Sequence, residues 1–266
     1  MYRTAIDLDA PHAAGFGLAI IRPMEDVVIL CGGRGTRLQE HSRSIPKPLV
    51  EIGGRPIIWH VMRIYAAQGL RRFTLCTGYR GEAIEESVRS HAWPDGVEVR
   101  CVDTGLDTPT GGRIAQVGPL LAGRPFLASY ADGVADIDLG RLIAFHRAHG
   151  DLATMTVVRP RLPFGVADLD GDGRVAGFRE KPYSEHWING GFFCLEPGVL
   201  DHLGEESVLE REPLEALASA GQLHAFRHDG FWDCMDTYKD AVLLNDLWSR
   251  GAAPWKIWND DSDWSR

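Results

Sequence analysis

The feature that most constrains the fold is a repeated alternation between short apolar runs and amphipathic stretches of ten to fifteen residues. The apolar runs predict strands at 26–31, 73–77, 97–102, 126–130 and 154–158. The longer stretches predict helices at 56–69, 81–91, 112–121, 139–149 and 237–249. Strands that alternate with helices of this length are typical of βαβ units with parallel strands. The sequence therefore predicts an α/β, Rossmann-like fold in which helices flank a mostly parallel sheet.

The segment 164–195 departs from this alternation, because glycine-rich turns separate short strand-like runs. We expect it to add an antiparallel β layer to the sheet. Within it, residues 168–173 (DLDGDG) begin like the calcium loop of an EF-hand, but the twelfth position is Arg179 instead of the required glutamate. Because the flanks are strand-like, we interpret the run as a hairpin turn.

The length of 266 residues suits one large domain, which we place at 25–258. We interpret residues 1–24 as an N-terminal extension, with Met24 a candidate native start, and 259–266 as an acidic tail. The mildly apolar run 13–21 lacks a preceding basic region and is much shorter than the ~20 residues that span a bilayer. We expect neither a signal peptide nor a membrane partner.

Charge and cysteine content narrow the function further. A formal net charge of −9 argues against a nucleic-acid partner, which requires a basic face. The five cysteines are far apart and include no C-x-x-C pair, so they indicate neither a zinc ribbon nor disulfides but a reducing cytoplasm. His146 and His149, three residues apart on a predicted helix, are interpreted as surface residues.

A glycine-rich loop after the first strand carries the clearest chemistry. It comprises Gly32, Gly33, Arg34, Gly35, Thr36 and Arg37, and a P-K-P run with Lys47 at its centre follows. Adjacent glycines let backbone N–H groups approach a phosphate, while Arg37 and Lys47 add positive charge. The flanking prolines are expected to hold Lys47 in extended backbone. A plain glycine turn is the alternative, and the P-K-P run argues against it. The spacing fits neither a dinucleotide fingerprint nor a Walker A loop.

Two aspartates follow predicted strand ends. Asp132 comes after the strand 126–130, at the edge of the sheet where open α/β folds bind ligands. Asp236 lies just before the helix 237–249, where an N-cap is the ordinary role of an aspartate. Mg²⁺ is typically held by one or two carboxylates together with substrate phosphates, so a metal site is the second interpretation.

The segment 30–60 (LCGGRGTRLQEHSRSIPKPLVEIGGRPIIWH) resembles the signature of the sugar-phosphate nucleotidyltransferase family. Within that family the chain is similar to the glucose-1-phosphate cytidylyltransferases, and the resemblance runs from about residue 25 to 258. The motifs that carry it are TGGR (110–113), YADGVADIDL (130–139), FG (164–165), EKP (180–182), INGGFF (188–193), MDT (235–237), KDAVLLNDLW (239–248) and PWKIW (254–258).

This resemblance implies the nucleotide-diphospho-sugar transferase type of fold and a Mg²⁺-dependent enzyme. The reaction would join a nucleoside triphosphate, with CTP favoured, to a sugar 1-phosphate, with α-D-glucose 1-phosphate favoured. The products would be CDP-glucose and pyrophosphate. The family commonly assembles into homo-oligomers, and we expect one here.

The resemblance also implies residue roles. Catalytic roles fall to Arg37, Lys47 and Lys181, and metal binding to Asp132 and Asp236. The nucleotide would be bound by Gly32, Gly33, Arg34, Gly35, Thr36, Thr110, Gly111 and Gly112. The sugar would be bound by Gly165, Glu180, Asn189 and Gly190.

Two departures from the cytidylyltransferase pattern leave the substrates open. The segment 91–102 is shorter than expected, and Ala131 replaces a glycine beside Asp132. UTP, dTTP or GTP, or another sugar phosphate, are the alternatives within the same chemistry. A non-catalytic relative that binds nucleotide-sugars is the alternative of another class. It is less favoured because the charged residues of the phosphate loop and of the aspartate pair are all present.

Overall fold

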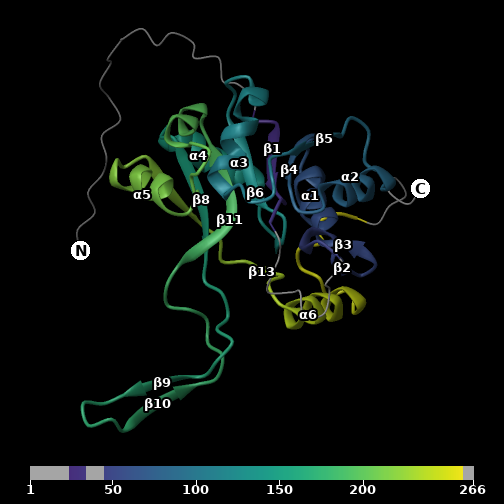
Figure 1. Cartoon of the computed structure of the whole chain (residues 1–266). Helices are drawn as coiled ribbons and strands as arrows, with labels where there is room; N and C mark the ends of the chain where they lie inside the picture. Colours follow the sequence, from purple (N-terminus) through teal and green to yellow (C-terminus); the bar gives the residue numbers. More distant parts are fainter. Residues whose placement is uncertain (1–23, 34–44, 260–266) are drawn as a thin grey trace, which may run out of the picture.

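A seven-stranded mixed sheet forms the centre of the computed structural model, which describes residues 24–33 and 45–259 (Figure 1). Its strands are β1 (Asp26–Leu30), β4 (Arg72–Thr77), β5 (Glu98–Asp103), β6 (Phe126–Tyr130), β8 (Ala153–Val158), β11 (Ile188–Leu195) and β12 (Leu223–Arg227). Their order across the sheet is β12-β8-β11-β6-β1-β4-β5. Only β11 among these strands runs antiparallel to its neighbours. The predicted α/β class with a mostly parallel sheet is confirmed.

Helices cover both faces of the sheet. They are α1 (Ile57–Ala67), α2 (Gly81–Ser90), α3 (Thr110–Val117), α4 (Leu139–His149), α5 (Glu212–Ser219) and α6 (Tyr238–Ser249). Successive side chains of a strand point to opposite faces, so Val27 and Ile29 of β1 pack into one core while Val28 packs into the other. The first core contains residues of α1, α2 and α4, and the second contains residues of α3 and α5. No described helix is long and apolar enough to cross a membrane.

The interpretation of His146 and His149 on α4 as surface residues is wrong. His146 is only 1% exposed, and His149 is half-buried. Both follow Leu139 and Leu142 at spacings of three and four residues, so they continue the inward face of the helix. The apolar residues earlier in the same helix therefore carried the signal that the two histidines face inward.

The segment 164–195 supplies the expected antiparallel strands, but they do not form one layer. β11 lies inside the main sheet, whereas β9 (Val166–Leu169) and β10 (Val175–Arg179) pair as a separate ribbon that projects from the body (Figure 1). At the tip, Asp170 Oδ1 accepts hydrogen bonds from the backbone N–H groups of Asp172 and Arg174, at 3.1 and 2.8 Å. The predicted hairpin turn is therefore confirmed over the EF-hand alternative.

Two short antiparallel pairs complete the strands of the described residues. β2 (Glu51–Ile52) pairs with β3 (Arg55–Pro56), and β7 (Gly133–Ala135) pairs with β13 (Trp232–Cys234). The predicted N-terminal extension (1–24) lies outside the described residues except for Met24. The predicted acidic tail (259–266) lies outside them except for Asn259.

An aromatic cluster around His60 fixes α6 and the segment after it against α1. The ring of Trp248 meets the ring of His60 edge-on at 4.7 Å between centroids, and Trp255 is fully buried beside them. His60 Nε2–H donates to the carbonyl of Ile52 at 2.8 Å, and Nδ1 accepts from Trp255 Nε1–H at 3.3 Å. Both ring nitrogens are therefore satisfied only when the imidazole is neutral.

This cluster predicts a loss of stability in acid. Burial lowers the pKa of His60 from 6.5 to about 4, so between these pH values the unfolded chain binds a proton that the folded chain does not. The free energy of unfolding should therefore fall as the pH drops through this window, by about 3 kcal/mol at most from this group. In His60→Gln, which keeps a donor for Ile52, Tm measured by circular dichroism should fall less steeply than in the wild type. The exposed His202→Gln is the control, and an equal slope in His60→Gln would contradict the assignment.

Candidate active site

A cavity of about 550 Å³ opens at the carboxyl ends of β1 and β6. The loop after β1, the turn at Lys47, the start of α3, the end of β6, β11 and the β13–α6 connection all contribute to its wall. Of the predicted site residues, those that line it are Gly32, Gly33, Lys47, Thr110, Asp132, Asn189, Gly190 and Asp236. The position agrees with the rule that open α/β sheets bind ligands beyond the carboxyl ends of their strands.

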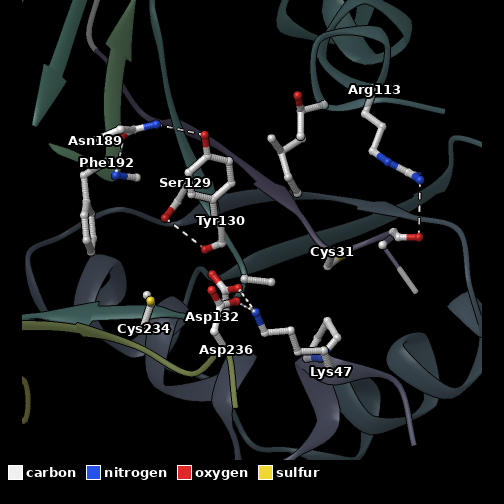
Figure 2. A pocket seen from close by; sticks show the side chains of 18 of the residues that line it. Cys31, Lys47, Arg113, Ser129, Tyr130, Asp132, Asn189, Phe192, Cys234 and Asp236 are labelled. Atoms are coloured by element: carbon white, nitrogen blue, oxygen red, sulfur yellow. Dashed lines mark hydrogen bonds and ion pairs between the residues drawn. The ribbon is translucent and has the colours of Figure 1, made fainter. Parts of the chain in front are cut away.

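The two aspartates, far apart in the sequence, are brought together by a short strand pair. Asp132 precedes β7 and Asp236 follows β13, and these strands pair antiparallel with Gly133 opposite Cys234. The N–H of Met235 donates to the Asp132 carbonyl at 3.0 Å, which extends the pairing to Asp132 and to the residue before Asp236. Both side chains consequently point to the same part of the cavity (Figure 2).

The N-cap alternative for Asp236 is wrong. Thr237 is the N-cap of α6, and its side chain and that of Asp240 form a reciprocal capping box. The Asp236 carboxylate turns into the cavity, where its Oδ1 lies 2.5 Å from Lys47 Nζ. The capping box thus fixes the start of the helix without using Asp236.

Lys47 lies between the two carboxylates and forms ion pairs with both Asp132 and Asp236 (Figure 2). Its side chain is 15% exposed. Burial by itself would lower the pKa of Lys47, but the two carboxylates outweigh this effect and raise it, so the ammonium stays charged.

The backbone of Lys47 differs from the prediction. It begins a 3-10 turn, Lys47–Leu49, and only Pro46 before it is extended. The N–H groups of Leu49 and Val50 close the turn on the carbonyls of Pro46 and Lys47, at 2.8 and 3.1 Å. Pro48 fits because the first N–H groups of a helical turn have no partner within the turn.

The site suits a divalent cation. Two carboxylate oxygens that contact the same ammonium nitrogen are close enough to share one ion. Mg²⁺ prefers one or two carboxylates, with substrate phosphates and water completing its shell. Asp132 and Asp236 are therefore the residues that could hold it, with Lys47 beside them.

A hydrogen-bonded chain crosses the cavity wall and was not predicted from the sequence. Asn189 Nδ2–H donates to the Tyr130 hydroxyl at 3.0 Å, and that hydroxyl donates to Glu210 Oε1 (Figure 2 shows the first contact). The other oxygen of Glu210 accepts from Thr110 Oγ1–H at 2.6 Å. Burial and the neighbouring Glu210 raise the pKa of Tyr130, so its phenol remains a donor. The chain links the predicted sugar-binding Asn189 to the predicted nucleotide-binding Thr110.

Several predicted glycines have a packing role that the structure explains. A Cβ at Gly32 would overlap the guanidinium of Arg113, which donates to the Gly32 carbonyl at 3.2 Å. A Cβ at Gly111 would lie 2.7 Å from the carbonyl oxygen of Ser207, and one at Gly112 would overlap the carbonyl of Glu205. Gly111 and Gly112 are buried and do not line the cavity, so their nucleotide contact stays a prediction.

Three predicted residues lie on the projecting arm, by which we mean residues 159–187, including β9 and β10. Gly165, Glu180 and Lys181 do not line the cavity. Gly165 packs against Phe178 across the ribbon, and Lys181 Nζ lies 3.8 Å from Glu180 Oε1. The predicted Arg34, Gly35, Thr36 and Arg37 lie outside the described residues.

Comparison with known proteins agrees with this geometry. A family model described as nucleotidyl transferase matches residues 26–249. The chain is 44% identical over 254 residues to the glucose-1-phosphate cytidylyltransferase of Salmonella typhi, a match that covers 87% of this chain and 98% of that protein. It is 40% identical over 252 residues to the probable glucose-1-phosphate cytidylyltransferase of Bacillus subtilis, covering 87% and 99%.

The fold is shared with solved structures. HddC from Yersinia pseudotuberculosis superposes with a TM-score of 0.67 at 25% sequence identity, covering 85% of this chain and all of that one. The family model covers most of the chain, and the curated relatives match over nearly their whole length. The chain with this lysine–aspartate site therefore belongs to the nucleotidyl transferase family.

Proposed function

We propose that this chain transfers a cytidylyl group from CTP to α-D-glucose 1-phosphate, giving CDP-glucose and pyrophosphate. The observation that carries the proposal is the convergence of Lys47, Asp132 and Asp236 in one cavity. Identities of 40–44% to curated glucose-1-phosphate cytidylyltransferases support the choice of substrates. Five unpaired cysteines are consistent with a reducing cytoplasm as the compartment.

The chemistry is a direct displacement. An oxygen of the sugar phosphate forms a bond to the α-phosphorus of CTP, and the bond from that phosphorus to the bridging oxygen of pyrophosphate breaks. The nucleophile is already an anion at neutral pH, so the protein needs no general base. Its tasks are to place the two phosphates in line and to neutralise charge.

Charged and polar side chains of this chain are proposed to place the phosphates and to neutralise their charge. Lys47 stands at the cavity wall, where it offsets the negative charge of the nucleotide phosphates. Arg37 is proposed to stabilise the charge that develops on pyrophosphate. Asp132 and Asp236 would hold Mg²⁺, which supplies positive charge between the carboxylates and the substrate phosphates. Asn189 and Gly190 would contact the sugar, with Tyr130 holding the amide of Asn189 in place.

We further propose that Glu180 and Lys181 act on the cavity of a second copy of the chain. Both lie on the arm, which projects away from the body that carries the cavity (Figure 1). The arm exposes large apolar side chains, with Phe164 76% and Phe178 64% exposed, which a neighbouring molecule would cover. A homo-oligomer of this kind would place the ammonium of Lys181 beside the sugar phosphate. It would also cover the exposed apolar side chains of the arm.

The substrate assignment is tested by pyrophosphate release in the presence of Mg²⁺. Each of CTP, UTP, dTTP, ATP and GTP is paired with glucose 1-phosphate, mannose 1-phosphate and galactose 1-phosphate. We expect release with CTP and glucose 1-phosphate, at a kcat/KM well above that of every other pair. A different preferred pair would contradict the substrate assignment and keep the chemistry, whereas no release with any pair would contradict both.

The metal assignment is tested by Asp236→Ala. Loss of one of the two converging carboxylates should lower kcat about a hundredfold or more, because charge neutralisation is the main catalytic task. Mg²⁺ binding in the presence of CTP should weaken in parallel, while circular dichroism shows the fold retained. The matched control is Asp246→Ala on α6, whose carboxylate pairs with Arg250 at 2.8 Å. Wild-type turnover in Asp236→Ala would refute the assignment.

Sharing of sites between copies is tested by complementation. Lys181→Ala removes the arm's ammonium, and Asp236→Ala removes a cavity carboxylate. Each variant alone should be inactive. When they are co-expressed, mixed oligomers contain sites built from an intact cavity and an intact arm, and roughly a quarter of the wild-type activity should return. Activity no higher than the sum of the two single variants would place the arm over its own cavity.

A further inference from the structure

A short segment before α5 supports the cavity wall at the start of α3. Residues 205–210 pack against the first turn of that helix, where a Cβ at Gly112 would overlap the carbonyl of Glu205. The N–H of Gly112 donates to the Ser207 carbonyl at 3.0 Å. Because the first N–H groups of a helix have no partner within it, this contact acts as a main-chain cap of α3. The segment is thereby fixed against the helix, together with Glu210 at its end.

The hydroxyl of Thr110, which lines the cavity, directs its proton to Glu210. Thr110 Oγ1–H donates to Glu210 Oε2 at 2.6 Å, because an ionised carboxylate has no proton to donate. The N–H of Leu209 donates to the same Oγ1 at 2.9 Å. A hydroxyl has one proton and two lone pairs, so these contacts leave one lone pair for a ligand. Thr110 therefore presents an acceptor to the cavity, while its proton is already used.

Glu210 gives the second hydroxyl of this wall the same polarity. Tyr130 Oη–H donates to Glu210 Oε1, and Tyr130 Oη accepts from Asn189 Nδ2–H at 3.0 Å. Each oxygen of one carboxylate thus takes the proton of one cavity hydroxyl. The side chain of Glu210 consequently decides which hydrogen-bonding groups of a ligand the two hydroxyls can accept.

The position of Thr110 makes it a contact of the nucleobase in the proposed reaction. Thr110 and Arg113 are three residues apart on α3 and so share one face, and Arg113 Nη2–H donates to the carbonyl of Gly32 at 3.2 Å. Thr110 is thereby placed near the loop after β1, which is predicted to bind the nucleotide. The lysine–aspartate site marks the place of the phosphates. Leu30 and Pro109 also line the cavity, and they offer apolar surface to the face of a base.

The pyrimidine bases differ in what they offer to such an acceptor. Cytosine carries an amino group at C4, which donates, whereas thymine and uracil carry a carbonyl oxygen there, which accepts. A lone pair of Thr110 that faces this position pairs with cytosine and opposes the oxygen of the other two bases. A site built to hydrogen-bond one group rejects an analogue that lacks it far more strongly than an apolar pocket does.

We propose that Glu210 is a positioning residue that determines base specificity. By accepting the proton of Thr110, it makes the Thr110 hydroxyl an acceptor for the amino group of cytosine and so selects CTP over UTP and dTTP. This inference rests on the proposed function, in which CTP is the nucleotide. Glu210 acts through Thr110 and needs no contact with the substrate of its own.

The ratio of kcat/KM with CTP to kcat/KM with UTP, both measured with glucose 1-phosphate, tests the proposal. Glu210→Ala frees the proton of Thr110, so that the hydroxyl can donate to uracil as well as accept from cytosine. The ratio should fall about tenfold or more, and UTP should become a stronger competitor of CTP. A merely structural role of Glu210 would lower kcat/KM for both nucleotides alike. Glu210 is exposed, and the equally exposed Glu215→Ala on α5 is the control that should keep the wild-type ratio.

Two variants of Thr110 complete the test. Thr110→Val keeps the shape of the side chain but has no lone pair, so the ratio should fall as in Glu210→Ala, whereas Thr110→Ser keeps the hydroxyl and should keep the ratio. An unchanged ratio in Glu210→Ala or in Thr110→Val, with the fold retained by circular dichroism, would overturn this inference and leave the proposed function standing. A wild-type preference for UTP or dTTP would instead overturn the proposed function, and this inference with it.

Discussion

The ion-pair triad of Lys47 with Asp132 and Asp236 is the interaction on which the rest of the site depends. It joins three segments that are far apart in the chain, and it places two carboxylates side by side that would otherwise repel each other. The ammonium of Lys47 therefore neutralises part of the charge of the two carboxylates in the absence of a metal ion, and it holds them together. The divalent ion proposed for the cavity would meet carboxylates that are already converged, and it would share them with the ammonium of Lys47.

The positions of these three residues are in turn fixed by parts of the fold that have no proposed role in binding or catalysis. The pairing of β7 with β13 sets the separation of the aspartates, and the capping box of α6 fixes the backbone just after Asp236. The aromatic cluster around His60 fixes α6 against α1. The C-terminal segment that contains Trp255 is consequently part of the support of the site, although it lies outside the cavity wall.

Much of this was predictable from the sequence, and the failures have physical causes. Strand β6 and helix α4 follow from apolar periodicity, and Asp132 from its position at a strand end. The same periodicity, extended to His146, would have shown that it is buried. The 3-10 turn at Lys47 depends on hydrogen bonds that local propensity does not encode. Glu210 has no motif around it and joins the site only through tertiary contacts, so sequence pattern could not identify it.

The chain of hydrogen bonds from Asn189 through Tyr130 and Glu210 to Thr110 has a consequence for how such a site can change during evolution. Its two ends, Asn189 and Thr110, both line the cavity, and no member can move without leaving a partner unsatisfied. A substitution that reshapes the pocket around one substrate is then felt by the other. With Thr110 at the nucleotide and Asn189 at the sugar, as proposed, preference for the base and preference for the sugar would become one inherited trait, and new pairs of substrates would arise by coordinated replacements instead of one residue at a time.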